Sequence, residues 1–168
     1  MSRRVEVVPY NPQWPHRYKS EAELLAGTLS QELIIVHHIG STAIPGMSAK
    51  PIIDILAEVR SIEHIDSFNP AMLKLGYMPK GEYGIPGRRF FIKGTEDERS
   101  CHLHVFQTSN PEIARHLRFR DYMIAHPAKA AEYASLKEYL ASRFPNDIDG
   151  YMQGKDAFIK EIDRIATI

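Results

Sequence analysis

The chain has 168 residues, of which 43% are apolar, 25% charged and 10% aromatic, which is typical of one globular domain spanning residues 1–168. Its 21 Lys and Arg residues balance 21 Asp and Glu residues, which excludes a broad attraction to nucleic acid or to an anionic membrane. The single Cys101, the short apolar runs and the polar N-terminus exclude a disulfide framework, a transmembrane helix and a signal peptide, so we expect a cytoplasmic protein.

Helix and strand signals alternate in the N-terminal half of the chain. Pro15 and the apolar residues at helical spacing behind it predict a helix, whereas short β-branched runs predict two strands. The expected elements are a short edge strand at 5–8, a helix at 15–31, strands at 33–39 and 51–59 around a turn-rich segment at 40–47, and a helix at 62–75.

The C-terminal half begins with two β-rich runs around a charged loop, a pattern typical of a hairpin. Asn110 and Pro111 then provide a helix cap and a favourable first helical residue. The expected elements are strands at 88–93 and 101–107 and helices at 111–125, 128–143 and 147–166. Because this order lacks strict βαβ alternation, we expect an α+β domain whose mixed β-sheet has flanking helices and a helical C-terminal part.

The segment between the first two long strands has the composition of a phosphate-binding loop. Gly40 allows the backbone to approach a ligand closely, and Ser41 and Thr42 add hydroxyl donors. Lys50 adds a positive charge just before the second strand. An ordinary Gly-Ser turn explains the same residues without a ligand, so both interpretations stay open at this point.

Three side chains in the strands are candidate metal ligands. Asp54 interrupts an otherwise apolar strand, where an unpaired carboxylate would be strongly destabilising. It therefore ligates a metal, pairs with a buried Lys or Arg, or lies at a hydrated strand end. His102 and His104 are two residues apart on a strand, so both imidazoles point to the same face and are able to share a metal ion.

Several cations occupy positions where apolar residues are expected. Arg88 and Arg89 open the first strand of the hairpin, and Arg120 and Lys155 lie on the apolar stripes of two helices. Each of them is explained singly by an internal salt bridge, or by a side chain that extends to the surface. Together they predict a cleft that holds a carboxylate or a phosphate.

The chain resembles the GrpB family over residues 5–165. The motifs that carry this resemblance lie at 10–15, 38–46, 49–55, 87–91, 102–106, 117–122 and 126–127, and at Tyr133, Leu136, Lys137, Tyr151, Gly154, Lys155, Phe158 and Ile159. A GrpB-like domain is also fused behind dephospho-CoA kinase in some bacteria. One departure is His37, where many relatives have Glu.

The resemblance implies the nucleotidyltransferase superfold. In that superfold a strand ends in Gly-Ser, and three acids on the next strands hold two divalent cations around a nucleoside triphosphate. Gly40, Ser41 and Asp54 match this pattern, but position 56 is Leu. Glu58 lies about 13 Å along the strand from Asp54, too far to share an ion. The strand with His102 and His104 stands where the third acid is expected.

Two functions follow from this incomplete pattern. The first is a nucleotidyltransferase in which Asp54 is catalytic and, with His102 and His104, holds Mg²⁺, Mn²⁺ or Zn²⁺. Its phosphate-binding residues would be Gly40, Ser41, Thr42, Lys50, Arg88, Arg89, Arg120 and Lys155. The second is a non-catalytic domain that binds a ligand or assists a partner enzyme. In both, the expected partner is a nucleotide or another small phosphorylated molecule.

These two functions share one geometric expectation. Ser41, Asp54, Arg89, His102 and His104 are expected to line a single cleft, because the strand ends and the turn between them lie together in such a sheet.

Overall fold

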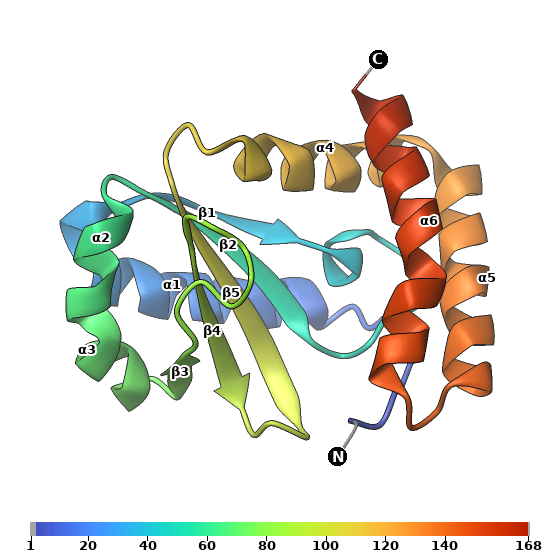
Figure 1. The fold of residues 1–168 in the computed structure, drawn as a ribbon, viewed down its shortest axis with the longest axis horizontal. Coiled ribbons are helices and arrows are strands. Elements are labelled where there is room, and N and C mark those ends of the chain that lie inside the picture. The colour runs from blue at the N-terminus through green and yellow to red at the C-terminus, as the bar shows by residue number, and fades with distance from the viewer. Residues whose placement is uncertain (1–2, 168) are drawn as a thin grey trace.

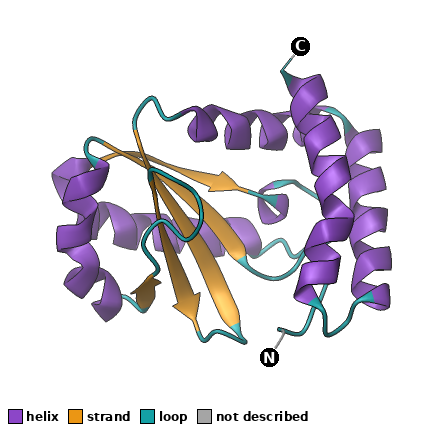
Figure 2. Ribbon diagram, viewed as in Figure 1, coloured by secondary structure: helices purple, strands orange, loops and turns teal. Residues whose placement is uncertain are grey.

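The computed structural model describes residues 3–167, which form a five-stranded mixed sheet flanked by helices (Figures 1 and 2). The strand order is β1-β2-β5-β4-β3, in which β2 and β5 are parallel and the other neighbours are antiparallel. The strands are β1 Leu33–Ile39, β2 Ile53–Val59, β3 Tyr77–Pro79, β4 Arg88–Gly94 and β5 Arg99–Gln107. The predicted α+β class with a mixed sheet is therefore confirmed.

Long and short helices surround this sheet. The long ones are α1 Trp14–Leu29, α4 Pro111–Ala125, α5 Pro127–Arg143 and α6 Ile148–Ala166, and the short ones are α2 Ile62–Ile65 and α3 Asn69–Lys74. Helix α1 contacts β1 and β2, and α4 packs beside β1. Helices α5 and α6 stand side by side beyond one end of the sheet, where they contact each other and α4 (Figure 1).

The structure differs from the sequence prediction at three places. The helix expected at 62–75 is broken into α2, a 3₁₀ turn at Asp66–Phe68 and α3, because Pro70 lies in the first turn of α3 and lacks the N–H that a continuous helix needs. The strand expected at 5–8 is a single bridge between Val8 and Ala49. Strand β3 was not predicted, since three residues are too few to show a periodicity.

The two faces of the sheet are covered differently. One face packs on α1, α2 and α3 through a large apolar cluster that includes Trp14, Ile55 and Leu103. On the other face, α4 covers Leu56 and Phe106. Asp54, His102 and His104 project from this second face toward the C-terminal helices, where a cavity remains.

None of the helices within residues 3–167 combines the length and the apolar composition that crossing a bilayer requires.

Candidate functional site

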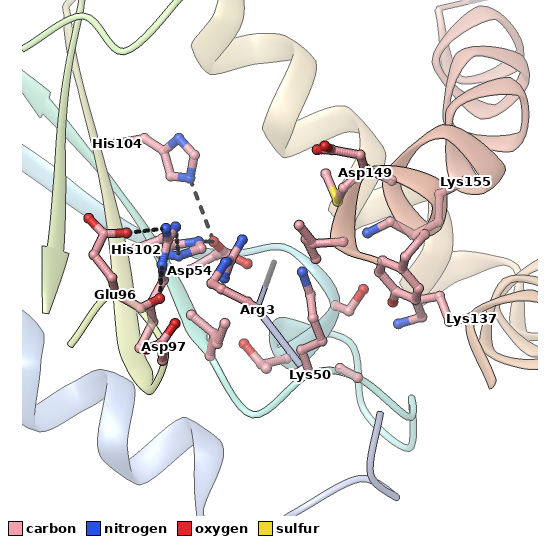
Figure 3. A pocket seen from close by; sticks show the side chains of 18 of the residues that line it. Arg3, Lys50, Asp54, Glu96, Asp97, His102, His104, Lys137, Asp149 and Lys155 are labelled. Carbon is pink, nitrogen blue, oxygen red and sulfur yellow. Dashed lines mark hydrogen bonds and ion pairs between the residues drawn. The ribbon is translucent and has the colours of Figure 1, made fainter. Parts of the chain in front are cut away.

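A cavity of about 660 Å³ separates the sheet from the C-terminal helices. Figure 3 shows Asp54 and His102 on the sheet side of it, Lys137 and Lys155 on the helical side, and Lys50 between them. The predicted residues that line it are Ser41, Thr42, Lys50, Asp54, His102, His104 and Lys155. The lining also includes charged and aromatic residues that the sequence analysis did not predict as site residues, among them Arg3, Tyr83, Glu96, Arg99, Lys137, Asp149 and Tyr151.

Asp54 lies near the start of β2, beside the end of the neighbouring strand β1. It is paired with Ile39 of β1 on one side and with His102 of β5 on the other. Gly40 follows β1 directly, with φ 72° and ψ −171°, a combination that only glycine adopts readily. A Cβ atom at position 40 would lie 2.7 Å from Oδ2 of Asp54, so Gly40 makes room for the carboxylate.

Both histidines face the same oxygen of this carboxylate. Nδ1 of His102 lies 3.5 Å from Oδ1 of Asp54, and Nε2 of His104 lies 3.6 Å from it (Figure 3). The side-chain exposures of the histidines are 16% and 13%, whereas that of Asp54 is 29%, so the carboxylate is held between the imidazoles and also faces the cavity.

Two arginines behind the histidines determine where the imidazole protons lie. The guanidinium of Arg99 is 3.3 Å from Nε2 of His102, and that of Arg88 is 3.1 Å from Nδ1 of His104. Arginine only donates hydrogen bonds, so each of these nitrogens accepts, and the other nitrogen of each neutral ring carries the proton. Both histidines therefore direct an N–H group at Asp54.

This arrangement keeps Asp54 ionised. Burial by itself raises the pKa of a carboxyl group, but the contacts with His102 and His104 outweigh it and hold the pKa of Asp54 well below its ordinary value. Burial likewise lowers the pKa of His102, more than Asp54 raises it. At neutral pH the site therefore contains an ionised carboxylate beside the neutral imidazole of His102.

The same arrangement does not fit a divalent metal held by the two histidines. A metal needs the unprotonated nitrogen of each ring, and a ligating histidine donates its other N–H to a carboxylate or a carbonyl. Here the partners behind His102 and His104 are guanidinium donors, which would face that N–H group. In the described part of the chain, no three His, Cys, Asp or Glu side chains form a ready metal-binding group.

Leu56 marks a second difference from a two-metal site. It projects from the same sheet face as Asp54, two residues further along β2, and is fully buried with Ile39, Phe106 and Ile113 under α4. The sheet position that would carry a second acid therefore belongs to the apolar core.

Three lysines form the opposite wall of the cavity. Lys50 precedes β2, while Lys137 and Lys155 come from α5 and α6, and the last two are only 1% and 8% exposed. The ammonium groups of Lys50 and Lys155 lie 5.2 and 4.7 Å from the centre of the Tyr151 ring. Lys137 donates to the carbonyl of Ser48. Within residues 3–167, none of the three has a carboxylate within 4.0 Å.

Burial, together with repulsion between the lysines, lowers the pKa values of this cluster. Burial, followed by repulsion from Lys155, lowers the pKa of Lys50 and of Lys137 to about 7. Burial lowers the pKa of Lys155 to about 8, although Asp54 opposes the shift. The three lysines are thus only partly charged near neutral pH, and no carboxylate of the described residues pairs with them.

The Gly-Ser-Thr segment contributes mainly Ser41 to the cavity. Thr42 is 2% exposed, and its hydroxyl lies 2.8 Å from Nε2 of His38, so it is already engaged. Residues Ser41–Ala43 form a 3₁₀ turn that packs on α1, β1 and β2.

The expectation that Arg89 shares this cleft is wrong. Alternation along β4 turns it to the opposite face of the sheet, where it pairs with Asp66 at 2.7 Å. Arg88 is 5% exposed and acts behind His104. Arg120 bonds Asp121 and the carbonyl of His38, so it ties α4 to the end of β1. None of the three lines the cavity.

Two important residues escaped the sequence analysis. Lys137 lies at helical spacing from Tyr133 and Leu140 on the buried stripe of α5, the same signal that identified Lys155. Arg99 follows a charged loop, and nothing in the sequence indicates that its guanidinium turns back onto His102.

The model of the family described as GrpB protein matches residues 4–164. The chain belongs to the GrpB family. It is 51% identical to UPF0157 protein YqkA of Bacillus subtilis over 164 residues, which are 98% of this chain but 48% of YqkA. It is 36% identical to the glutamate-rich protein GrpB of Alkalihalophilus pseudofirmus, covering 94% and 93% of the two chains. The chain thus spans about half the length of YqkA.

Solved structures extend this result to the fold. The crystal structure of the conserved protein GrpB from Enterococcus faecalis superposes with a TM-score of 0.92 at 43% identity, covering 96% of each chain. The structure of Cid1 poly(U) polymerase superposes with a TM-score of 0.54 at 10% identity, covering 82% of this chain and 43% of that one. The GrpB domain therefore has a nucleotidyltransferase-like fold, and both expectations are confirmed.

Replacing Gly40 tests the close approach to Asp54. We expect Gly40→Ala to lower the free energy of unfolding by more than about 2 kcal/mol, because the strained backbone and the carboxylate contact act together. Gly46→Ala is the matched control, since Gly46 also has a left-handed φ of 78° but open space around it. Urea denaturation of both variants measures the difference, and equal losses would contradict the close contact.

The histidine tautomers are directly measurable. In ¹⁵N spectra at pH 7.5 we expect the proton on Nδ1 of His102 and on Nε2 of His104, unchanged by Zn²⁺. Arg99→Gln removes the obligatory donor, so His102 alone should become a mixture of tautomers. A Zn²⁺-dependent change at both rings that Asp54→Asn abolishes would show a metal site and refute this assignment.

Proposed function

We propose that this GrpB domain binds the phosphate groups of a small phosphorylated molecule, such as a nucleotide, in the cavity between Asp54 and the three lysines. The observation that carries the proposal is the cluster of the half-buried Lys50 and the buried Lys137 and Lys155, which lines the cavity without a carboxylate partner in the described chain. Buried like charges are unfavourable unless a counter-ion joins them. A ligand with several negative charges is such a counter-ion.

Positively charged, neutral and negatively charged residues of the cavity would contact different groups of the ligand. The lysines neutralise the phosphates, and Ser41 offers a hydroxyl donor from the turn after β1. Asp54, kept ionised by two N–H donors, accepts a hydrogen bond from a hydroxyl or amino group of the ligand. The cavity volume of about 660 Å³ suits a ligand of nucleotide size.

Ligand binding is better supported than metal-dependent nucleotidyl transfer. That reaction needs acids around two cations, whereas Leu56 is buried in the core and the histidines direct N–H groups at Asp54. The chain is also 26% identical to part of a dephospho-CoA kinase of Mycolicibacterium paratuberculosis, 46% of which is covered. A phosphate-binding domain that assists a partner enzyme is consistent with that similarity.

Replacing a cavity lysine by an apolar residue of similar length distinguishes an effect on ligand binding from an effect on the stability of the fold. We expect Lys155→Met to raise the melting temperature of the free protein, because it removes a buried charge, and to abolish the stabilisation by tripolyphosphate. Lys160→Met, at an exposed position of the same helix, should change neither. Differential scanning fluorimetry with and without tripolyphosphate measures both effects. Full stabilisation of Lys155→Met by tripolyphosphate would refute the proposal.

The lowered pKa values also predict a pH dependence. Lys50 and Lys137 bind protons less tightly in the folded state than in the unfolded chain, where a lysine pKa is about 10.4. Their contribution to stability therefore increases as the pH rises from about 7 to about 10. Bound phosphates favour the charged lysines, so tripolyphosphate should stabilise the protein more at pH 6.5 than at pH 9.

The ligand itself cannot produce this trend, because phosphate groups gain negative charge as the pH rises. Calorimetric titration at the two pH values provides the measurement. Tighter binding at pH 9 would place the phosphates away from the lysine cluster.

A further inference from the structure

An exposed tyrosine at the edge of the cavity has no role in the site described so far. Tyr83 lies in the segment between β3 and β4, which crosses in front of the strands in Figure 1. Its φ of 51° is unusual for a bulky residue. Gly81, Gly84 and Gly87 around it also have positive φ values, so the segment is tightly turned.

Several hydrogen bonds hold this segment in place. Gly81 accepts from the backbone N–H of Phe90 at 2.8 Å. The carboxylate of Glu82 accepts from the N–H of Gly87 at 2.7 Å, and Arg88 donates to the carbonyls of Glu82 and Tyr83. The strained position of Tyr83 is therefore maintained by its surroundings, as is common at functional sites.

In the described part of the chain, the ring of Tyr83 stacks on one other aromatic ring. It stacks on Phe90 with the ring centres 5.1 Å apart and the planes at 13°, yet Tyr83 is 51% exposed and lines the cavity. Phe90 is itself only 5% exposed, so its buried ring supports the ring of Tyr83 in a fixed position. Among residues 3–167 no second ring stacks on Tyr83, so we expect its exposed side to accept a planar group.

The stack is joined directly to the charged site. The Phe90 ring contacts the rings of His102 and His104, with centres 5.3 and 5.1 Å apart, and both histidines contact Asp54. Through Phe90, Tyr83 thus belongs to the sheet-side wall of the cavity. Lys137 and Lys155 belong to the helical wall (Figure 3). A ligand that uses both walls has a planar aromatic group at one end and negative charge at the other.

We infer that Tyr83 is a stacking platform for the base of a nucleotide whose phosphates lie on Lys50, Lys137 and Lys155. This inference rests on the proposed phosphate binding and narrows the ligand class from phosphorylated molecules in general to nucleotides. Aromatic side chains stack on every nucleobase, so the platform selects for a base without fixing which one.

The test compares ligands with and without a base. We expect at least one of the four ribonucleoside triphosphates to bind the wild type more tightly than tripolyphosphate. Tyr83→Ala should weaken that nucleotide about 5- to 150-fold, the range for the loss of one base stack, and leave tripolyphosphate within about 2-fold. Tyr83→Trp should keep nucleotide binding. Tyr139→Ala, which removes a 59% exposed tyrosine on α5 away from the cavity lining, is the matched control.

The outcomes separate the two proposals. Equal affinities for tripolyphosphate and all four nucleotides, or unchanged nucleotide binding in Tyr83→Ala, would overturn the inference and leave phosphate binding standing. Binding of neither tripolyphosphate nor any nucleotide would overturn both. A fluorescent etheno-nucleotide gives an independent readout, because its emission should be quenched by stacking in the wild type and not in Tyr83→Ala.

Discussion

Asp54 is an ionised carboxylate in the apolar strand β2, where it would be strongly destabilising if left alone. Two imidazole N–H groups stabilise it, and each imidazole is in turn oriented by a guanidinium from Arg88 or Arg99. Gly40 leaves the space that the carboxylate occupies. Neighbouring strands are thus joined by one polar contact network whose negative charge faces the cavity.

The lysine wall is the electrostatic complement of this network. In the nucleotidyltransferase superfold that the family resembles, metal ions held by acids neutralise the substrate phosphates. Here Leu56 stands where a second acid would be expected, and the half-buried Lys50 and the buried Lys137 and Lys155 line the cavity. Like metal ions, lysine ammonium groups neutralise the negative charge of phosphates. Without a bound anion, however, several ammonium groups placed close together destabilise the folded protein. The free protein therefore carries a destabilising cluster that a bound anion would relieve.

The position of the helices explains why the cavity lies where it does. Helix α4 covers the sheet face over Leu56 and Phe106, and the face near Asp54 is left to α5 and α6. These two helices stand beyond the end of the sheet (Figure 1), and Lys137, Tyr151 and Lys155 of their buried stripes line the cavity. The aromatic stack of Tyr83 on Phe90 completes the wall on the sheet side.

The sequence by itself determined the strands β1, β2, β4 and β5 and the long helices, because hydrophobic periodicity and proline positions are local signals. It also identified Asp54, His102, His104 and Lys155, since a polar residue on an apolar face is visible without a structure. Only the tertiary structure showed that Arg89 faces away and that Arg88 and Arg99 set the histidine tautomers. Strand pairing and side-chain direction join residues far apart in the chain, and no local pattern encodes those contacts.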